Sequence, residues 1–188
     1  MALKDSNPAL LVIDVQEGFD LENHWGGNRN NPDLEDKLGQ LLNTWREMGL
    51  PVIHSKHDST EPNSPLNPNH EGNKLKAFAV PQNGEPMFPK QVNSAFIGTG
   101  LEKYLKEKGI DTLVIVGLTT NHCISTTTRM AGNLGFKAFL LSDVTATFDR
   151  KGLNGEVFPA EEVHNISLAS LHEEFATVLS KEELLKIL

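Results

Sequence analysis

The stretch "DTLVIVGLTTNHCISTTTRMAGNLG", residues 111–135, decides the fold class of this chain. It opens with an apolar, β-branched run over 112–117, which is typical of a strand buried on both faces of a parallel sheet. A helical pattern follows from about His122 to Leu134, and Gly135 closes it. Cys123, the only cysteine in 188 residues, lies where the strand gives way to the helix.

Similar patterns lie on both sides of this unit. Strands alternating with helices predict βαβ units, and hence a parallel sheet covered by helices. We therefore expect one domain over residues 1–188, with a three-layer, Rossmann-like α/β fold and a mainly parallel, six-stranded sheet. The other predicted strands are 9–14, 50–55, 85–88, 137–143 and 174–180, and the other predicted helices are 33–48, 98–108 and 160–172.

Composition narrows the function classes. The formal net charge is −8, from 25 acidic and 17 basic residues, which disfavours nucleic-acid binding because phosphate contacts need Lys and Arg. A single cysteine excludes an internal disulfide and suits a reducing compartment. No apolar run approaches the ~20 residues of a membrane span, and the first residues lack signal-peptide features. We expect a cytoplasmic protein without nucleic-acid or membrane partners.

Two long polar segments, residues 15–32 and 58–89, interrupt the alternation of strands and helices. Loops of this length in a compact α/β domain usually serve a site or an interface. We therefore expect these two segments to border the functional site.

Three reactive side chains follow predicted strands. Asp14 ends the run 9–14, Lys90 follows the run 85–88, and Cys123 follows the run 112–117. Taken singly, the aspartate could be a loop anchor, the lysine a solvated charge and the cysteine a small buried hydrophobe. Ligands of open α/β sheets, however, bind outside the carboxyl ends of the strands. The three side chains are therefore predicted to meet at that edge.

Together these side chains predict nucleophilic chemistry. A thiolate is the reactive form of cysteine, and a helix N-terminus and a nearby ammonium both favour it. An aspartate within reach can take the thiol proton and later return it to a leaving group. Backbone N–H groups around Cys123 could supply an oxyanion hole.

Three stretches carry a resemblance to a known family. They are "ALLVIDVQEGF" at 9–19, "FPKQVNSAF…DVTATF" at 88–148 and "EEVHNISLASLHEEFATVLSKEEL" at 161–184. In order and spacing they resemble the isochorismatase-like cysteine hydrolase superfamily, which includes nicotinamidases, N-carbamoylsarcosine amidases and ureidoacrylate amidohydrolases.

The resemblance implies the roles of particular residues. It places the catalytic trio on Asp14, Lys90 and Cys123, and a cis peptide bond between Leu118 and Thr119. It also implies that the Thr119 and Cys123 amides form the oxyanion hole.

The resemblance further implies an activity. Isochorismatase itself lacks the nucleophilic cysteine, so the cysteine present here favours a hydrolase that cleaves a small amide-type C–N bond through a thioester. It implies no cofactor, a small-molecule amide substrate and a homodimer or homotetramer. The alternatives are a catalytically retired or redox-sensing member of the fold that acts as a binding or regulatory protein.

Candidate substrate contacts come from the loops beside the trio. Phe19 and Trp25 would form an aromatic wall for a flat amide, or else pack beneath their own loop. Gln16 would orient Asp14 or Lys90, and Asp143 would anchor a loop or an interface. The other candidates are Asn93, Phe96, Leu118 and Asn121, with Ser94 beside the pocket and His122 at the surface.

A metal site is not expected. Nicotinamidases resembling this chain hold a metal with an Asp and, two residues on, a His after the second strand. Here His57 and Ser59 stand at those positions, which breaks the pattern. His54, His57 and His70 would therefore line the pocket, hold the long loop or be solvated.

Overall fold

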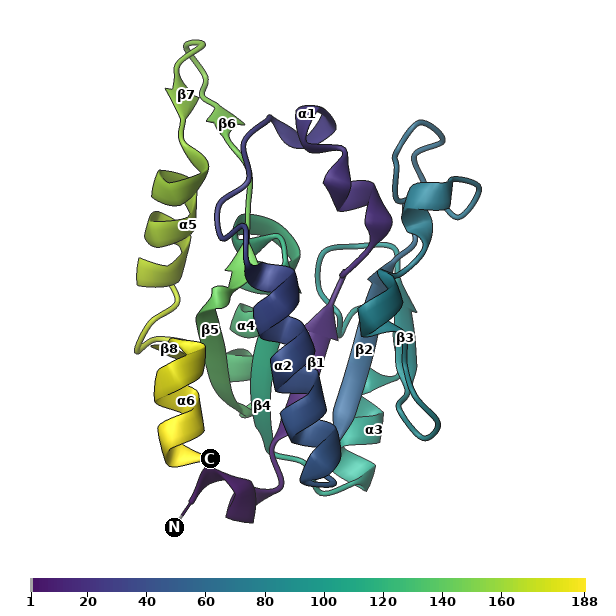
Figure 1. The fold of residues 1–188 in the computed structure, drawn as a ribbon, viewed down its shortest axis with the longest axis vertical. Helices are drawn as coiled ribbons and strands as arrows, with labels where there is room; N and C mark the ends of the chain where they lie inside the picture. Colours follow the sequence, from purple (N-terminus) through teal and green to yellow (C-terminus); the bar gives the residue numbers. More distant parts are fainter. Residues whose placement is uncertain (1) are drawn as a thin grey trace.

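A computed structural model describes residues 2–188 and shows a three-layer α/β fold (Figure 1). All strand pairs of its six-stranded sheet are parallel, which confirms the predicted fold class. The strands lie in the order β3 (Met87–Lys90), β2 (Val52–His57), β1 (Ala9–Ile13), β4 (Thr112–Leu118), β5 (Lys137–Ala146) and β8 (Thr177–Leu179).

Helices cover both faces of the sheet, because its central strands are apolar on both sides. Leu10 and Val12 of β1 belong to a core shared with α2 (Leu34–Glu47) and α6 (Lys181–Ile187), which lie in front of the sheet in Figure 1. Leu11 and Ile13 face the opposite core. The helices of that second face are α3 (Leu101–Glu107), α4 (Ser125–Asn133) and α5 (Ala160–Ala169).

None of the helices formed by residues 2–188 combines the length and the apolar character that are needed to cross a lipid bilayer.

Several short elements were not predicted. The sequence does contain a signal for the start of helix α6, a capping box formed by Ser180 and Glu183. Each of these side chains accepts a hydrogen bond from the backbone N–H of the other residue. A hairpin extends beyond the sheet in Figure 1 and is formed by β6 (Arg150–Lys151) and β7 (Val157–Phe158). The remaining short elements are α1 (Glu22–Trp25), η1 (Leu3–Ser6), η2 (Glu17–Asp20), η3 (Glu71–Asn73), η4 (Ala77–Ala79) and η5 (Thr120–Ile124).

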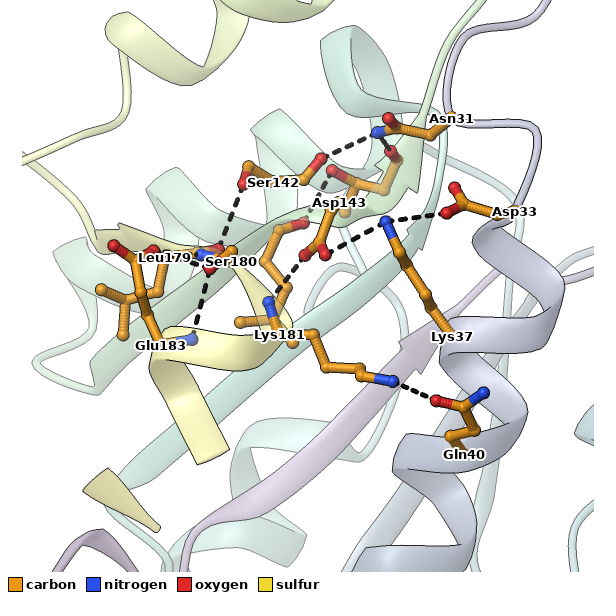
Figure 2. Close-up of polar contacts among 12 residues, drawn as sticks. Asn31, Asp33, Lys37, Gln40, Ser142, Asp143, Leu179, Ser180, Lys181 and Glu183 are labelled. Carbon is orange, nitrogen blue, oxygen red and sulfur yellow. Dashed lines mark hydrogen bonds and ion pairs between the residues drawn. The ribbon is translucent and has the colours of Figure 1, made fainter. Parts of the chain in front are cut away.

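Asp143 lies inside β5 rather than at its end, since this strand continues to Ala146. Its carboxylate accepts a hydrogen bond from the backbone N–H of Lys181, at 2.7 Å, and pairs with Lys37 of α2, at 3.3 Å (Figure 2). Asp143 therefore ties α2 and α6 to the sheet, a structural role at a distance from the reactive trio.

The strands β1 and β4 approach each other closely at Gly117, which pairs with Ile13. The residue has φ +118°, and a Cβ atom there would lie 2.0 Å from the carbonyl oxygen of Ile13. We expect Gly117→Ala to lower the free energy of unfolding by about 3 kcal/mol or more, because it combines backbone strain with a clash against rigid backbone. Urea unfolding followed by circular dichroism measures this.

The control for this change is Gly49→Ala. Gly49 also has positive φ, +66°, but a Cβ atom at this position would meet no other atom within 4 Å. Backbone strain alone predicts a loss of about 1 kcal/mol there. Equal losses for the two variants would contradict the steric argument at Gly117.

Candidate active site

The three predicted side chains meet at the edge of the sheet formed by the carboxyl ends of its strands. Asp14 follows β1, Lys90 ends β3, and Cys123 lies in η5 directly after β4. The Lys90 ammonium nitrogen is 2.6 Å from Asp14 Oδ2 and 3.2 Å from Cys123 Sγ. All three residues are buried, so the trio lies at the edge of the sheet but away from bulk water.

The backbone at Asp14 turns sharply away from β1. Its φ is +53°, in the left-handed region that aspartate enters more readily than most residues. The Asp14 N–H still donates to the carbonyl of Ser55 on β2, at 2.9 Å. The strand thus ends at this residue and leaves the carboxylate at the edge of the sheet.

Cys123 lies in a π-helical turn, which precedes the regular helix α4. The carbonyl of Thr119 accepts hydrogen bonds from the N–H groups of His122 and Ile124, at 3.1 and 3.2 Å, on either side of Cys123. The Leu118–Thr119 peptide bond before this turn is cis. Such turns recur at functional sites, and this one brings the Cys123 side chain and backbone to the cavity.

The charge balance of the trio decides the state of the thiol. Asp14 and Lys90 form an ion pair with both side chains fully buried. Burial opposes the ammonium, but the Asp14 carboxylate raises the pKa of Lys90 above its usual value. Burial and the Asp14 carboxylate raise the pKa of Cys123 despite Lys90. Because one ammonium compensates one carboxylate, the resting cysteine is a thiol, unlike the thiolate that the sequence favoured.

One carboxylate oxygen is left free. Asp14 Oδ2 receives the Lys90 ammonium, whereas Oδ1 is buried without a hydrogen-bond partner among residues 2–188. An unpartnered buried acceptor beside a thiol is suited to take a proton from it.

His57 completes the surroundings of Lys90, with its Nδ1 atom 3.1 Å from the ammonium nitrogen. Ligand-type atoms of Asp14, His57 and Cys123 lie within 4.8 Å of one another, a spacing that could suit a metal ion. Each of them, however, contacts the Lys90 ammonium, which already supplies the positive charge of this cluster. The residues present fit an ammonium-centred site better than a metal centre.

The other two histidines of interest lie elsewhere. His54 is buried and its Nε2 atom is 2.9 Å from the carboxylate of Glu85, which also binds Arg46. His70 is exposed and contacts the carbonyl of Pro62, at 2.8 Å. Both therefore hold surrounding structure rather than line the cavity.

A cavity of about 200 Å³ opens beside Cys123. Phe19 and Trp25 form one wall, with ring centroids 4.8 Å apart, and Leu66 extends it. The polar lining comes from two groups: His57 at the end of β2 with Ser59 and Ser64 after it, and Asn93, Thr119 and His122 around the thiol.

The predicted substrate contacts divide into two sets. Phe19, Trp25 and Asn93 line the cavity, and Asn93 Oδ1 is 3.8 Å from Cys123 Sγ. His122 lines it as well, half-buried rather than at the surface. Ser94 is buried, and its hydroxyl accepts the N–H of Phe96.

Three predicted contacts lie outside the cavity. Phe96 packs against Phe136 in the hydrophobic core, with ring centroids 5.7 Å apart, because burial removes both apolar rings from water. Leu118 is fully buried in the core on the opposite face. Asn121 accepts a hydrogen bond from Thr147 and borders a small adjoining cavity of about 10 Å³, which shares Trp25, Thr119 and His122 with the first.

Gln16 has a different role from the predicted one. Its side-chain amide donates to the carbonyls of His57 and Asn73, at 3.0 and 2.9 Å, and its oxygen accepts the N–H of His57, at 2.9 Å. Gln16 thus positions His57 instead of Asp14 or Lys90. Sequence reasoning also missed Ser64 and Leu66, for which loop length was the only available signal.

The comparisons with known proteins agree with this geometry. The isochorismatase domain profile matches residues 8–183, so the chain belongs to the isochorismatase family. Homologues in this family are hydrolases, including amidohydrolases.

Three relatives give the extent of the match. The isochorismatase family protein YrdC of Bacillus subtilis is 47% identical over 96% of both chains. A crystal structure of a hydrolase of this family from Chromobacterium violaceum has a TM-score of 0.93 and 42% identity, covering 100% of this chain and 96% of that one. Nicotinamidase 3 of Arabidopsis thaliana is 28% identical, covering 94% of this chain and 86% of its own.

Proposed function

We propose that this protein is a cysteine amidohydrolase that cleaves a small amide-type C–N bond through a thioester on Cys123. The observation that carries the proposal is the contact of one buried ammonium, Lys90, with both Asp14 and Cys123, at 2.6 and 3.2 Å. The similarity to a nicotinamidase, an enzyme named for an amide substrate, supports the same reaction class.

Acylation begins with the resting thiol. Its proton moves to the free Oδ1 of Asp14 as sulfur attacks the substrate carbonyl, so a full thiolate need not accumulate. The N–H groups of Thr119 and Cys123 stabilise the oxyanion of the tetrahedral intermediate. The C–N bond then breaks, and the proton held by Asp14 passes to the departing nitrogen, which leaves as ammonia or an amine.

Deacylation uses the same residues in reverse. A water molecule gives a proton to Asp14 while its oxygen attacks the thioester carbonyl. The C–S bond breaks, the carboxylic acid product leaves, and the sulfur recovers its proton from Asp14. At each stage the Lys90 ammonium compensates the negative charge, whether that charge lies on the Asp14 carboxylate or on the Cys123 sulfur.

The rival functions fit the site less well. A redox sensor needs an accessible thiol with a low pKa, whereas burial and Asp14 raise the pKa of Cys123. A binding protein that had lost catalysis would have no need of Asp14, Lys90 and Cys123 in mutual contact.

The experiment is to trap the thioester. The wild-type protein is mixed with a panel of small primary amides, released ammonia is measured, and acid-quenched samples are analysed by intact mass and peptide mapping. We expect ammonia release together with an acyl adduct on Cys123, the single cysteine. Iodoacetamide labelling should suppress ammonia release in proportion to the label. Turnover by fully labelled protein would exclude the cysteine mechanism.

A further inference from the structure

We propose that His164 of α5 is a positioning residue for the nucleophile turn, the π-helical turn Thr120–Ile124 that carries Cys123. The imidazole is 3% exposed, and it lies between the Thr120 hydroxyl and the carbonyl of Ser142 in β5, at 2.9 Å from each. His164 does not line the cavity beside the thiol, so it acts through Thr120. The inference rests on the proposed function, because it takes Cys123 as the reacting group.

The two contacts of the ring fix the direction of both hydrogen bonds. A carbonyl only accepts, so His164 Nε2 carries the ring proton and donates it to Ser142. Burial lowers the pKa of His164 below its usual value, although the Ser142 carbonyl and the Glu161 carboxylate oppose this effect. The ring is therefore neutral and Nδ1 holds a lone pair. It follows that the Thr120 hydroxyl donates to Nδ1.

The Thr120 hydroxyl depends on this contact. Thr120 is fully buried, and His164 is the only hydrogen-bond partner of its hydroxyl within residues 2–188. Thr120 is also the first residue of the nucleophile turn, directly after Thr119. The bond to His164 therefore fixes the start of the turn, between the Thr119 and Cys123 amides that we assign to the oxyanion hole.

The other end of the contact is a rigid part of the sheet. Ser142 lies where β5 bulges away from β4, in the segment between Leu140 and Thr145 that has no partner on β4. Such bulges recur beside active sites. The side-chain amide of Asn31 donates to the same Ser142 carbonyl, at 2.9 Å, and to the carbonyl of Thr145, at 2.7 Å (Figure 2). One carbonyl thus holds both the nucleophile turn and the loop that carries the aromatic wall.

The first test removes the ring. His164→Leu leaves the Thr120 hydroxyl without an acceptor, so the start of the nucleophile turn is no longer fixed. We expect kcat for ammonia release to fall by about 10–100-fold, as for one buried donor left unpaired, with KM within about threefold of the wild type.

Alkylation of Cys123 should change in the opposite direction. A loosened turn relieves the burial and the Asp14 contact that raise the pKa of the thiol. We therefore expect iodoacetamide to label Cys123 about tenfold faster at pH 8 in His164→Leu than in the wild type. This measurement requires no substrate.

Thr120→Val tests the same bond from its other partner. Valine has nearly the shape of threonine but no hydroxyl, so we expect the same two changes, slower turnover and faster alkylation. Thr128→Val in α4 is the matched control, because Thr128 is fully buried and its hydroxyl has no partner within residues 2–188. Its kcat and its alkylation rate should equal those of the wild type.

Two further variants separate positioning from stability. In His164→Gln the side-chain oxygen can accept from Thr120 and the nitrogen can donate to Ser142, so both rates should stay within about threefold of the wild type. Leu184→Ala weakens the core on the opposite face of the sheet and should leave both rates unchanged. Circular dichroism of each variant shows that it is folded.

The double variant His164→Leu/Thr120→Val shows whether the two residues act as one unit. If they do, its kcat and its alkylation rate should match those of the more affected single variant, because the second change removes a bond that is already broken. Effects that multiply in the double variant would overturn the proposal. A His164→Gln no better than His164→Leu would overturn it as well.

The two readouts distinguish this proposal from the amidohydrolase. If the wild type releases no ammonia from any amide, the proposed function fails, and the alkylation rates still decide whether His164 positions Cys123. Wild-type alkylation and turnover in Thr120→Val would overturn the positioning role and retain the amidohydrolase. Because Thr120→Val conserves the shape of the side chain, this test holds even if His164→Leu does not fold.

Discussion

Asp14→Asn is expected to lower kcat for amide hydrolysis by about 10³–10⁴-fold and, at the same time, to make Cys123 easier to deprotonate. The first effect follows because asparagine cannot accept the thiol proton or return it to the leaving nitrogen. The second follows because the Asp14 carboxylate raises the pKa of Cys123 and the Lys90 ammonium lowers it. With the carboxylate gone, the ammonium remains and favours the thiolate.

The combination tests this mechanism only in folded protein. A disrupted fold would also free the thiol from burial and lower its pKa, so circular dichroism has to show that Asp14→Asn retains the wild-type fold. A thiolate that is already formed in the wild type would show little further change in its alkylation profile. The folded-state pKa of the thiol should therefore fall in a variant whose catalysis is nearly abolished.

The measurement is the rate of iodoacetamide alkylation against pH for the wild type and Asp14→Asn, beside ammonia release at one pH. Cys123 is the single cysteine, so the mass of the protein reports alkylation at this position alone. Asp36→Asn, an exposed position of α2, makes the same chemical change without contacting the site. An alkylation profile that stays in place or moves to higher pH in Asp14→Asn would contradict the charge balance described above.

The parts of the candidate site that sequence reasoning could place are those fixed by regular structure. Asp14, Lys90 and Cys123 each lie at or just after the end of a strand of one parallel sheet, and the carboxyl ends of such strands share an edge. Apolar runs indicate those strands, so the meeting of the three side chains follows from periodicity and topology. The Lys90 ammonium lies within hydrogen-bonding distance of both Asp14 and Cys123.

The parts that could not be predicted depend on contacts between loops. Gln16 reaches His57 and Asn73, 41 and 57 residues away, and no local pattern reveals such pairings. Phe96 was assigned to the pocket from its place near Lys90, but its apolar ring is buried against Phe136. Proximity in sequence to Lys90 therefore does not show whether a side chain lines the cavity or packs in the core.

The protonation state of Cys123 was also beyond the reach of the sequence, but for a different reason. A helix N-terminus and a lysine are visible in the sequence, and both favour a thiolate. The depth of burial and the pairing of that lysine with Asp14 are visible only in the structure. Together they reverse the expectation, because the ammonium in contact with Cys123 is already compensated.

Lys90→Met is expected to abolish measurable turnover and to lower the free energy of unfolding by about 3–5 kcal/mol. The Asp14–Lys90 pair is completely buried, so removing the cation leaves an uncompensated carboxylate in a low-dielectric environment. The loss in kcat should be at least about 10³-fold, because negative charge on oxygen or sulfur would lack its counter-ion throughout the reaction. Urea unfolding and ammonia release measure the two effects. Lys103→Met, at an exposed position of α3, is the control.

The double variant Asp14→Asn/Lys90→Met identifies the cause of the instability. If the cost in Lys90→Met is the unpaired charge, removing that charge should recover most of the lost stability, so that the double variant is more stable than Lys90→Met. Activity should not return, because the proton acceptor and the counter-ion are then both absent. A double variant no more stable than Lys90→Met would show that the lysine acts through packing of its side chain. Recovery of stability without activity would show that the instability of Lys90→Met comes from the unpaired carboxylate, and that catalysis requires both charged residues.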